Sequence, residues 1–317
     1  MNHSQQYPVI KEAHYNYHTN IMDLSFAISF LTANFAYAAE FQNIFMAVQG
    51  AMAVRNGPNK DGKMKSFHAF LQGVVTAFAG GIMTPLWMGR ATPMLANDLC
   101  FGCCIIAFLL VNSTPLDIGH KVLNLFPFRM LTIMGAQLFR NRGIIAFVNI
   151  AHQTFKENPS PYYPTPVFGP ILNACILGNM GSFFFKGFHG HLKDGMPYIV
   201  QNGLFVASTY HFIANDQGPI GEYLREAIAK LPIEMDPVLL ITLVGGLFMQ
   251  ISALLQMPDF FGPSFNPFDL LLAPINAFSK PKVQKTVQMK IKTVSESAPS
   301  QKKSKSQKKK AAQKKKK

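Results

Sequence analysis

Charged residues are scarce in this chain: Asp, Glu, Lys and Arg make up only 15% of its 317 residues. Soluble domains usually contain about 25%. Tryptophan occurs once, whereas phenylalanine occurs 28 times and apolar residues reach 49%. This composition argues against an ordinary soluble domain, and a membrane protein is the first class to test.

The excess of positive charge is confined to one end. Between positions 280 and 317 the chain has 15 lysines and one acid, Glu296, which account for its whole net charge of +14. This segment has no aromatic residue, so we expect a disordered tail that lies on anionic lipid or solvates the chain end. RNA binding is the weaker alternative, and we expect no nucleic-acid partner. The final KKKK also has the form of a dilysine retrieval signal for the endoplasmic reticulum.

Cysteine is scarce as well. Three of the four cysteines lie inside the apolar run LCFGCCIIAFLLV and the fourth lies in another: Cys100, Cys103, Cys104 and Cys175. No second CxxC pair and no nearby histidine completes a zinc site. The pattern therefore predicts buried free thiols, and we expect no metal site.

Seven apolar stretches have the length of about 20 residues that a bilayer requires. They span approximately 22–47, 67–88, 95–116, 122–152, 166–188, 196–215 and 236–257. The sequence thus predicts an all-α integral membrane protein with seven transmembrane helices. We expect a lumenal segment at 1–21, a membrane domain at 22–258 and a cytosolic tail at 259–317. The first residues are polar, so no signal peptide is expected there.

The charges of the loops predict the orientation. An odd number of spans puts the two ends on opposite sides, and the lysine-rich tail belongs in the cytosol by the positive-inside rule. The loop after the first span, on the same side, carries Arg55, Lys60, Lys63 and Lys65. We therefore expect the N-terminus in the lumen.

Two spans are interrupted by glycine in a similar way. The second reads FAGGIMTPLW with Gly80 and Gly81, and the fifth reads ILGNMGSFFF with Gly178 and Gly181. If spans one to three and four to six are two copies, they insert with opposite topology. Paired broken helices in such an inverted repeat point to a central permeation or binding site.

The fourth span adds charge to that site, since it contains Arg129, Arg140 and Arg142. Arg140 lies ~20 Å along a helix that starts at Pro127, at about 1.5 Å per residue. An arginine at that depth costs about 2.5–3.5 kcal/mol, so it should face protein, water or lipid headgroups. The purely structural alternatives are an internal ion pair of the arginines with Glu40 or Asp23, or a tilted helix whose arginines extend to the membrane surface.

Several short motifs, in order, resemble the trimeric intracellular cation (TRIC) channel family. They are MAVR (52–55), FAGGI (78–82), LAN (95–97), PFR (127–129) and GNMGS (178–182). The resemblance runs from about residue 40 to residue 190. In the fourth span the family has a lysine and a glutamate where this chain has Ala136 and Gln137, whereas Arg140 keeps the family's arginine.

The resemblance implies two inverted three-helix repeats plus a seventh helix, assembled as a homotrimer with one pore per protomer. It implies a K⁺ channel of the endoplasmic or sarcoplasmic reticulum that supplies counter-ion current during Ca²⁺ release. It also implies pore kinks at Gly80, Gly81, Gly178 and Gly181, and binding of a phosphoinositide headgroup by Arg140. Because Arg129 and Lys121 lie nearer the membrane surface, we expect them to help bind that headgroup. We expect no catalytic residue and no cofactor beyond that lipid.

Two rival functions remain open. A secondary transporter would use the same inverted repeats. A membrane-embedded enzyme would rest on His189 and His191, which are close enough in sequence to share a metal, but the other histidines are scattered singly.

Overall fold

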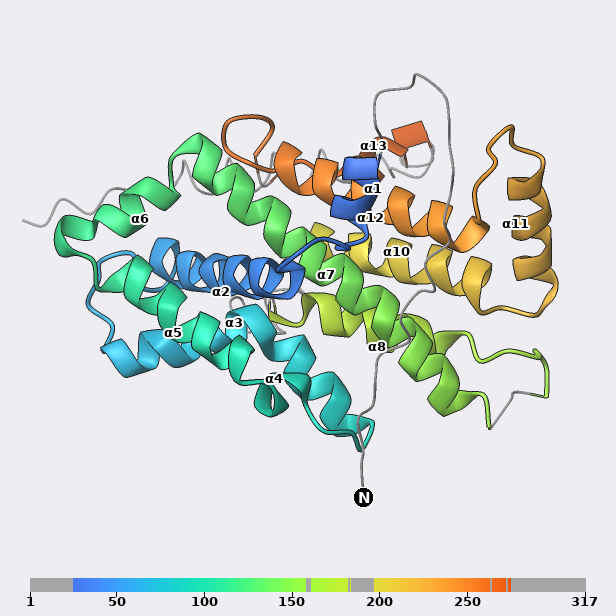
Figure 1. The fold of residues 1–317 in the computed structure, drawn as a ribbon, viewed down its shortest axis with the longest axis horizontal. Helices are drawn as coiled ribbons and strands as arrows, with labels where there is room; N and C mark the ends of the chain where they lie inside the picture. Colours follow the sequence, from blue (N-terminus) through green and yellow to red (C-terminus); the bar gives the residue numbers. More distant parts are fainter. Residues whose placement is uncertain are drawn as a thin grey trace, which may run out of the picture. The chain divides into compact units, whose positions relative to one another are not determined.

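The computed structural model describes residues 25–157, 161–181, 183, 197–262, 264–271 and 273–274. Over this part of the chain the regular elements are helices, without a strand (Figure 1). The chain divides into two compact units: the first ends at Phe265, and the second begins at Asn266 and contains α13 (Pro267–Leu271). Every other helix among the described residues belongs to the first unit. The predicted all-α fold is confirmed.

Two groups of three helices build the first unit. The helices of the first group pack on one another and are α2 (Ala38–Asn56), α3 (Ser66–Trp87) and α5 (Asp98–Asn112). Those of the second are α7 (Phe126–Phe155), α8 (Phe168–Asn179) and α10 (Tyr198–Ala214). A further long helix, α12 (Pro237–Leu255), packs on α7 and α10. Figure 1 shows α7 running between the first group and the pair α10 and α12.

Short helices precede or join these long ones. They are α1 (Ser25–Leu31), α4 (Pro93–Ala96), the 3₁₀ turn η1 (Pro115–Asp117), α6 (Ile118–Leu123) and α11 (Pro219–Ala229). The first predicted span, 22–47, is displaced. The chain breaks between α1 and α2, where Ala33 and Tyr37 have φ values of 55° and 61°, and such residues cannot continue a right-handed helix. The long helix therefore starts at Ala38 and ends at Asn56.

Length and hydropathy separate the described helices into two kinds. Helices α3 and α12 are long and apolar enough to cross a membrane unaided, and α5 joins the segment Pro115–Asn124 as a candidate span bent by 86°. Helix α7 is longer, at 30 residues, but its three arginines lower its mean hydropathy. The predicted end of the fifth span, at 188, lies outside the described residues. A total of seven spans stays a prediction.

Glycines allow α3 and the end of α8 to touch through their backbones. A Cβ atom at Gly80 would overlap the carbonyl oxygen of Leu177, and a Cβ atom at Gly181 would overlap that of Thr76. Along α3 the contacts run from Thr76 to Gly80, while on the other segment they run from Gly181 back to Leu177. The two segments are therefore antiparallel where they cross. Small residues permit this approach in membrane helices. The reciprocal contact is what an inverted repeat produces, because a two-fold rotation exchanges its two halves.

The other two predicted kink residues have different surroundings. Helix α3 is continuous from Ser66 to Trp87 through both glycines and Pro85, and a Cβ atom at Gly81 would meet nothing within 4 Å. A Cβ atom at Gly178 would lie 2.8 Å from the side chain of Ile144 in α7. Three of the four glycines therefore lie at helix contacts. Their role in bending pore helices stays a prediction.

The close approach predicts different outcomes for neighbouring glycines. Gly80→Ala should lower the free energy of unfolding by about 1–3 kcal/mol, because the new methyl group overlaps a backbone carbonyl that moves only with its helix. Gly81→Ala is the matched control and should change stability by less than about 0.5 kcal/mol. Thermal unfolding of the detergent-purified variants measures both. Equal destabilisation by the two would contradict the contact with Leu177.

A buried carboxylate joins α10, α11 and the segment before α8. Asp216, 1% exposed, accepts hydrogen bonds from the backbone N–H groups of Gly218 (3.0 Å) and Gly221 (2.8 Å) and from the hydroxyl of Tyr163 (2.7 Å). Arg225 donates to its backbone carbonyl at 2.7 Å. Burial alone would raise the pKa of Asp216, but these hydrogen bonds hold the pKa below its ordinary value.

This arrangement predicts a pH-dependent contribution to stability. Asp216→Asn should cost about 2–3 kcal/mol at neutral pH, because charge-assisted hydrogen bonds are lost. A lowered folded-state pKa means that the contribution is complete above the ordinary aspartate pKa of about 4 and is lost as the pH falls through the folded value. Thermal unfolding between neutral and acidic pH should show the variant and the original protein converging. A difference that is independent of pH would contradict the lowered pKa.

Candidate functional site

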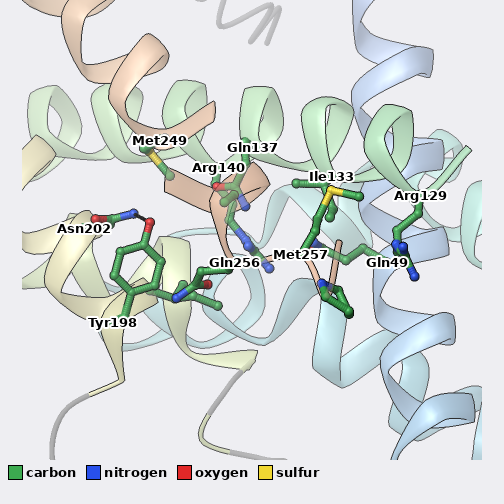
Figure 2. A pocket seen from close by; sticks show the side chains of 13 residues that line it. Gln49, Arg129, Ile133, Gln137, Arg140, Tyr198, Asn202, Met249, Gln256 and Met257 are labelled. Carbon is green, nitrogen blue, oxygen red and sulfur yellow. Dashed lines mark hydrogen bonds between the residues drawn. The ribbon is translucent and has the colours of Figure 1, made fainter. Parts of the chain in front are cut away.

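A cavity of ≈190 Å³ lies between α7, α10, α12 and α2 (Figure 2). Helix α7 lines it with one face, since the residues at i, i+4, i+8 and i+11 point the same way: Arg129, Ile133, Gln137 and Arg140. The facing walls carry Gln49 of α2, Tyr198, Ile199 and Asn202 of α10, Met249 and Ala253 of α12, and Gln256, Met257 and Pro258 of the turn after it. Figure 2 shows Arg140 between Tyr198 and Asn202 on one side and Arg129 on the other.

The guanidinium of Arg140 is partly buried, and two of its nitrogen atoms have unused donors. Its Nε and Nη1 atoms, and the Nε atom of Arg129, are inaccessible and have no hydrogen-bond partner within the described chain. Neither the predicted pair with Glu40 nor any other ion pair of Arg140 is present among those residues, and Asp23 lies outside them. A buried unpaired charge costs several kcal/mol. These donors therefore suit an anionic or strongly polar ligand.

Oxygen atoms face the same space. The side-chain oxygens of Gln49 and Asn202 are buried and accept no hydrogen bond from any described residue. The Asn202 side-chain N–H donates to the hydroxyl of Tyr198 at 2.5 Å, which fixes the direction of its carbonyl. On the α12 side, the amide of Gln250 donates to the backbone carbonyl of Met134 at 2.9 Å and so ties α12 to α7. The cavity thus offers oxygens to a cation and guanidinium groups to an anion.

The predicted site residues separate into those that line the cavity and those that do not. Arg140 and Arg129 line it. Lys121 is exposed on α6, outside the lining, and Arg142 is exposed on α7. The residues that replace the family's lysine and glutamate are buried: Ala136 is 0% exposed, and Gln137, 5% exposed, belongs to the lining.

None of the glycines predicted to kink the pore lines this cavity. Sequence reasoning missed the polar residues on the facing walls, above all Gln49, Tyr198 and Asn202. A signal for them exists, since Tyr198 and Asn202 are polar, four residues apart and inside an apolar span.

Metal and thiol chemistry find no support in the described part of the chain. The four cysteines are free and buried, as predicted, and Cys100 donates its S–H to the side-chain oxygen of Asn43 at 2.8 Å. Groups of three or more His, Cys, Asp or Glu residues able to hold a metal are absent among the residues searched. His189 and His191, the basis of the enzyme hypothesis, lie outside the described residues.

The unpaired charge of Arg140 predicts that replacing this side chain with an apolar one raises the stability of the protein. Arg140→Met should raise the free energy of unfolding by about 1–3 kcal/mol, because an apolar side chain of similar length replaces a buried charge without partners. Arg142→Met, two residues further on and exposed, is the control and should stay within about 0.5 kcal/mol of the original protein. Chemical denaturation in detergent measures both. A large loss of stability in Arg140→Met would mean that the guanidinium is already paired.

Comparison with known proteins gives no match to a protein-family model or to a curated protein. Solved structures do match. A trimeric intracellular cation channel from C. elegans in the absence of Ca²⁺ superposes with a TM-score of 0.53 at 16% identity, over 74% of this chain and 97% of that one. The same kind of channel from C. elegans with bound Ca²⁺ gives a TM-score of 0.51 at 14% identity, with the same coverage. The chain therefore has the all-α membrane fold of the trimeric intracellular cation channels.

Proposed function

We propose that this protein is a cation channel, selective for monovalent cations and chiefly K⁺, with one conduction pathway in each protomer of a homotrimer. The observation that carries the proposal is the polar cavity around Arg140, inside a fold shared with trimeric cation channels over 97% of a known channel chain. A purely structural helical protein gains nothing from a charged side chain in its interior, whereas charged residues inside membrane helices commonly mark ion pathways.

The lining explains how a cation would be both accepted and controlled. Side-chain oxygens such as those of Gln49 and Asn202 replace part of the hydration shell of an ion. The guanidinium of Arg140 opposes entry, since two like charges 4 Å apart repel by about 4 kcal/mol at an effective dielectric constant of about 20. Conduction therefore requires an anion that neutralises Arg140.

An anionic inositol lipid is the proposed neutralising partner. Planar guanidinium groups bind phosphate through two hydrogen bonds at once, and Arg140 and Arg129 both keep buried donors toward the cavity. We place the headgroup at the cytosolic end of the pathway, near Arg129. Lys121, exposed on α6, is a helper at the membrane surface.

The proposed setting is the membrane of the endoplasmic or sarcoplasmic reticulum, with the N-terminus lumenal and the tail cytosolic. The lysines between positions 280 and 317 support this orientation. A K⁺ pathway in that membrane would return counter-ions while Ca²⁺ leaves the store. The ion-channel role, the trimer and the phosphoinositide site form one proposal, in which the lipid permits the current.

A secondary transporter is the second candidate, because the antiparallel crossing near Gly80 and Gly181 is also the architecture of inverted-repeat carriers. The two functions differ in kinetics. A channel passes current in discrete openings, whereas a carrier saturates and exchanges its substrate.

Reconstitution of the purified protein into a planar bilayer tests the proposal. We expect discrete K⁺ openings from a particle whose mass by light scattering is that of a trimer. Saturable exchange without unitary openings would favour the carrier, and a silent bilayer would contradict the channel.

The lipid part of the proposal predicts an order among the arginines. Arg140→Ala should weaken phosphoinositide binding by about tenfold or more, because charge-assisted hydrogen bonds contribute about 1.5–3 kcal/mol each. Arg142→Ala is the control and should have little effect, since it lies about 200° around the helix. Native mass spectrometry of both variants with bound lipid measures the order. Loss of lipid from Arg142→Ala alone would show that the opposite face of α7 binds it.

A further inference from the structure

The chain that follows α12 forms one wall of the cavity. We call residues 256–262 the α12 turn; its first three residues, Gln256, Met257 and Pro258, belong to the cavity lining. The turn folds back on itself through hydrogen bonds from the N–H of Phe261 to the carbonyl of Leu255 and from the N–H of Gly262 to that of Met257, each 3.1 Å. Met257 is 2% exposed. Any movement of this turn therefore changes the cavity.

Two side-chain contacts hold the turn against the start of α7. The carboxylate of Asp259 pairs with the Nη2 group of Arg129, which is itself a cavity residue. Next to it, the rings of Phe260 and Phe126 meet edge to face with centroids 6.0 Å apart. The turn is thus fastened to α7 partly through an arginine that faces the cavity.

The ion pair leaves donors of the same arginine unused. Asp259 pairs with Nη2 of Arg129, whereas the buried Nε of Arg129 has no partner in the described chain. The Nε and Nη1 atoms of Arg140 have no partner there either. The side chains of Arg129 and Asp259 are 25% and 36% exposed, so water screens their attraction. Half-exposed ion pairs of this kind contribute little net stability and exchange readily.

The distance between the two arginines indicates what kind of anion fits. They lie eleven residues apart on one face of α7, or ~16 Å along its axis at about 1.5 Å per residue. A ligand with phosphates at separate positions, such as a phosphorylated inositol ring, engages both more readily than a single phosphate does. A protein carboxylate in this position offers one charge only, so it satisfies Arg129 partially.

We propose that Asp259 is a built-in competitor of the cavity's anionic ligand. In the ligand-free protein its carboxylate holds Arg129 and keeps the α12 turn against α7. A phosphorylated inositol headgroup that binds Arg129 and Arg140 displaces the carboxylate and releases the turn, which opens that wall of the cavity. This inference rests on the proposed function, and it assigns to the same site an internal control of ligand affinity and of opening.

The test measures ligand binding to the full-length protein and to Asp259→Asn, with Glu226→Gln as the matched control. Glu226 is exposed on α11, away from the cavity lining, and its substitution makes the same change of charge. Two probes are used: soluble inositol trisphosphate, and phosphatidylcholine vesicles that contain phosphatidylinositol bisphosphate. We expect Asp259→Asn to bind at least one probe about three- to fivefold more tightly, as expected on removal of a half-exposed ion pair. Glu226→Gln should be unchanged.

A second variant separates competition from a structural role of the turn. In an Arg129→Gln background Asp259 has lost its ion-pair partner, so Asp259→Asn should no longer tighten ligand binding. Tighter binding by Asp259→Asn in that background would overturn the proposal. Unchanged or weaker binding by Asp259→Asn alone would also overturn it, while leaving the anion site intact. If the original protein binds neither probe, the anion site of the proposed function fails and the competitor fails with it. Tighter binding of the vesicles alone identifies the ligand as a lipid, and tighter binding of both probes identifies the headgroup as sufficient.

Discussion

The guanidinium of Arg140 constrains the packing of α7 more than any other group, because its inaccessible Nε and Nη1 atoms have no hydrogen-bond partner in the described chain. Several kcal/mol are needed to keep such a group out of water without a partner. The neighbouring turns of α7 supply part of that free energy, since Ala136, Ile144 and Val148 are 0% exposed and pack against the surrounding helices. Ala136 and Ile144 lie four residues before and after Arg140, so apolar packing one turn away on either side stabilises the helix that carries the charge.

The crossing of α3 with the end of α8 allows that packing to form around a polar interior. Gly80 and Gly181 bring two antiparallel backbones into contact, and this contact joins the two three-helix groups. A side chain at either position would force the groups apart. The cavity lies between α7, α10, α12 and α2, where residues of several elements contribute oxygen and guanidinium groups. A polar interior inside an apolar fold is the physical basis of the proposed conduction pathway.

Much of this fold could be predicted from the sequence where a single helix is marked by its own continuous apolar stretch. The second predicted span, 67–88, matches α3 at Ser66–Trp87, and the last, 236–257, matches α12 at Pro237–Leu255. The break before α2 could not be predicted, because it depends on Ala33 and Tyr37 adopting positive φ rather than on hydropathy. The depth of Arg140 in its span led us to expect protein, water or headgroups around it, and Arg140 lines the cavity. The sequence could not identify the oxygens of Gln49 and Asn202, because only tertiary packing brings α2 and α10 to the same cavity.

The central claim, that Arg140 lies beside the ion pathway, is tested most directly by attaching charge at that position. Arg140→Cys would be reconstituted and treated with water-soluble thiol reagents of opposite charge while current is recorded, with Leu138→Cys, whose native side chain is 1% exposed, as the control. We expect the cationic and anionic reagents to change the K⁺ current of Arg140→Cys in opposite directions. Neither reagent should affect Leu138→Cys. Currents of Arg140→Cys that respond equally to both reagents, or to neither, would contradict the account.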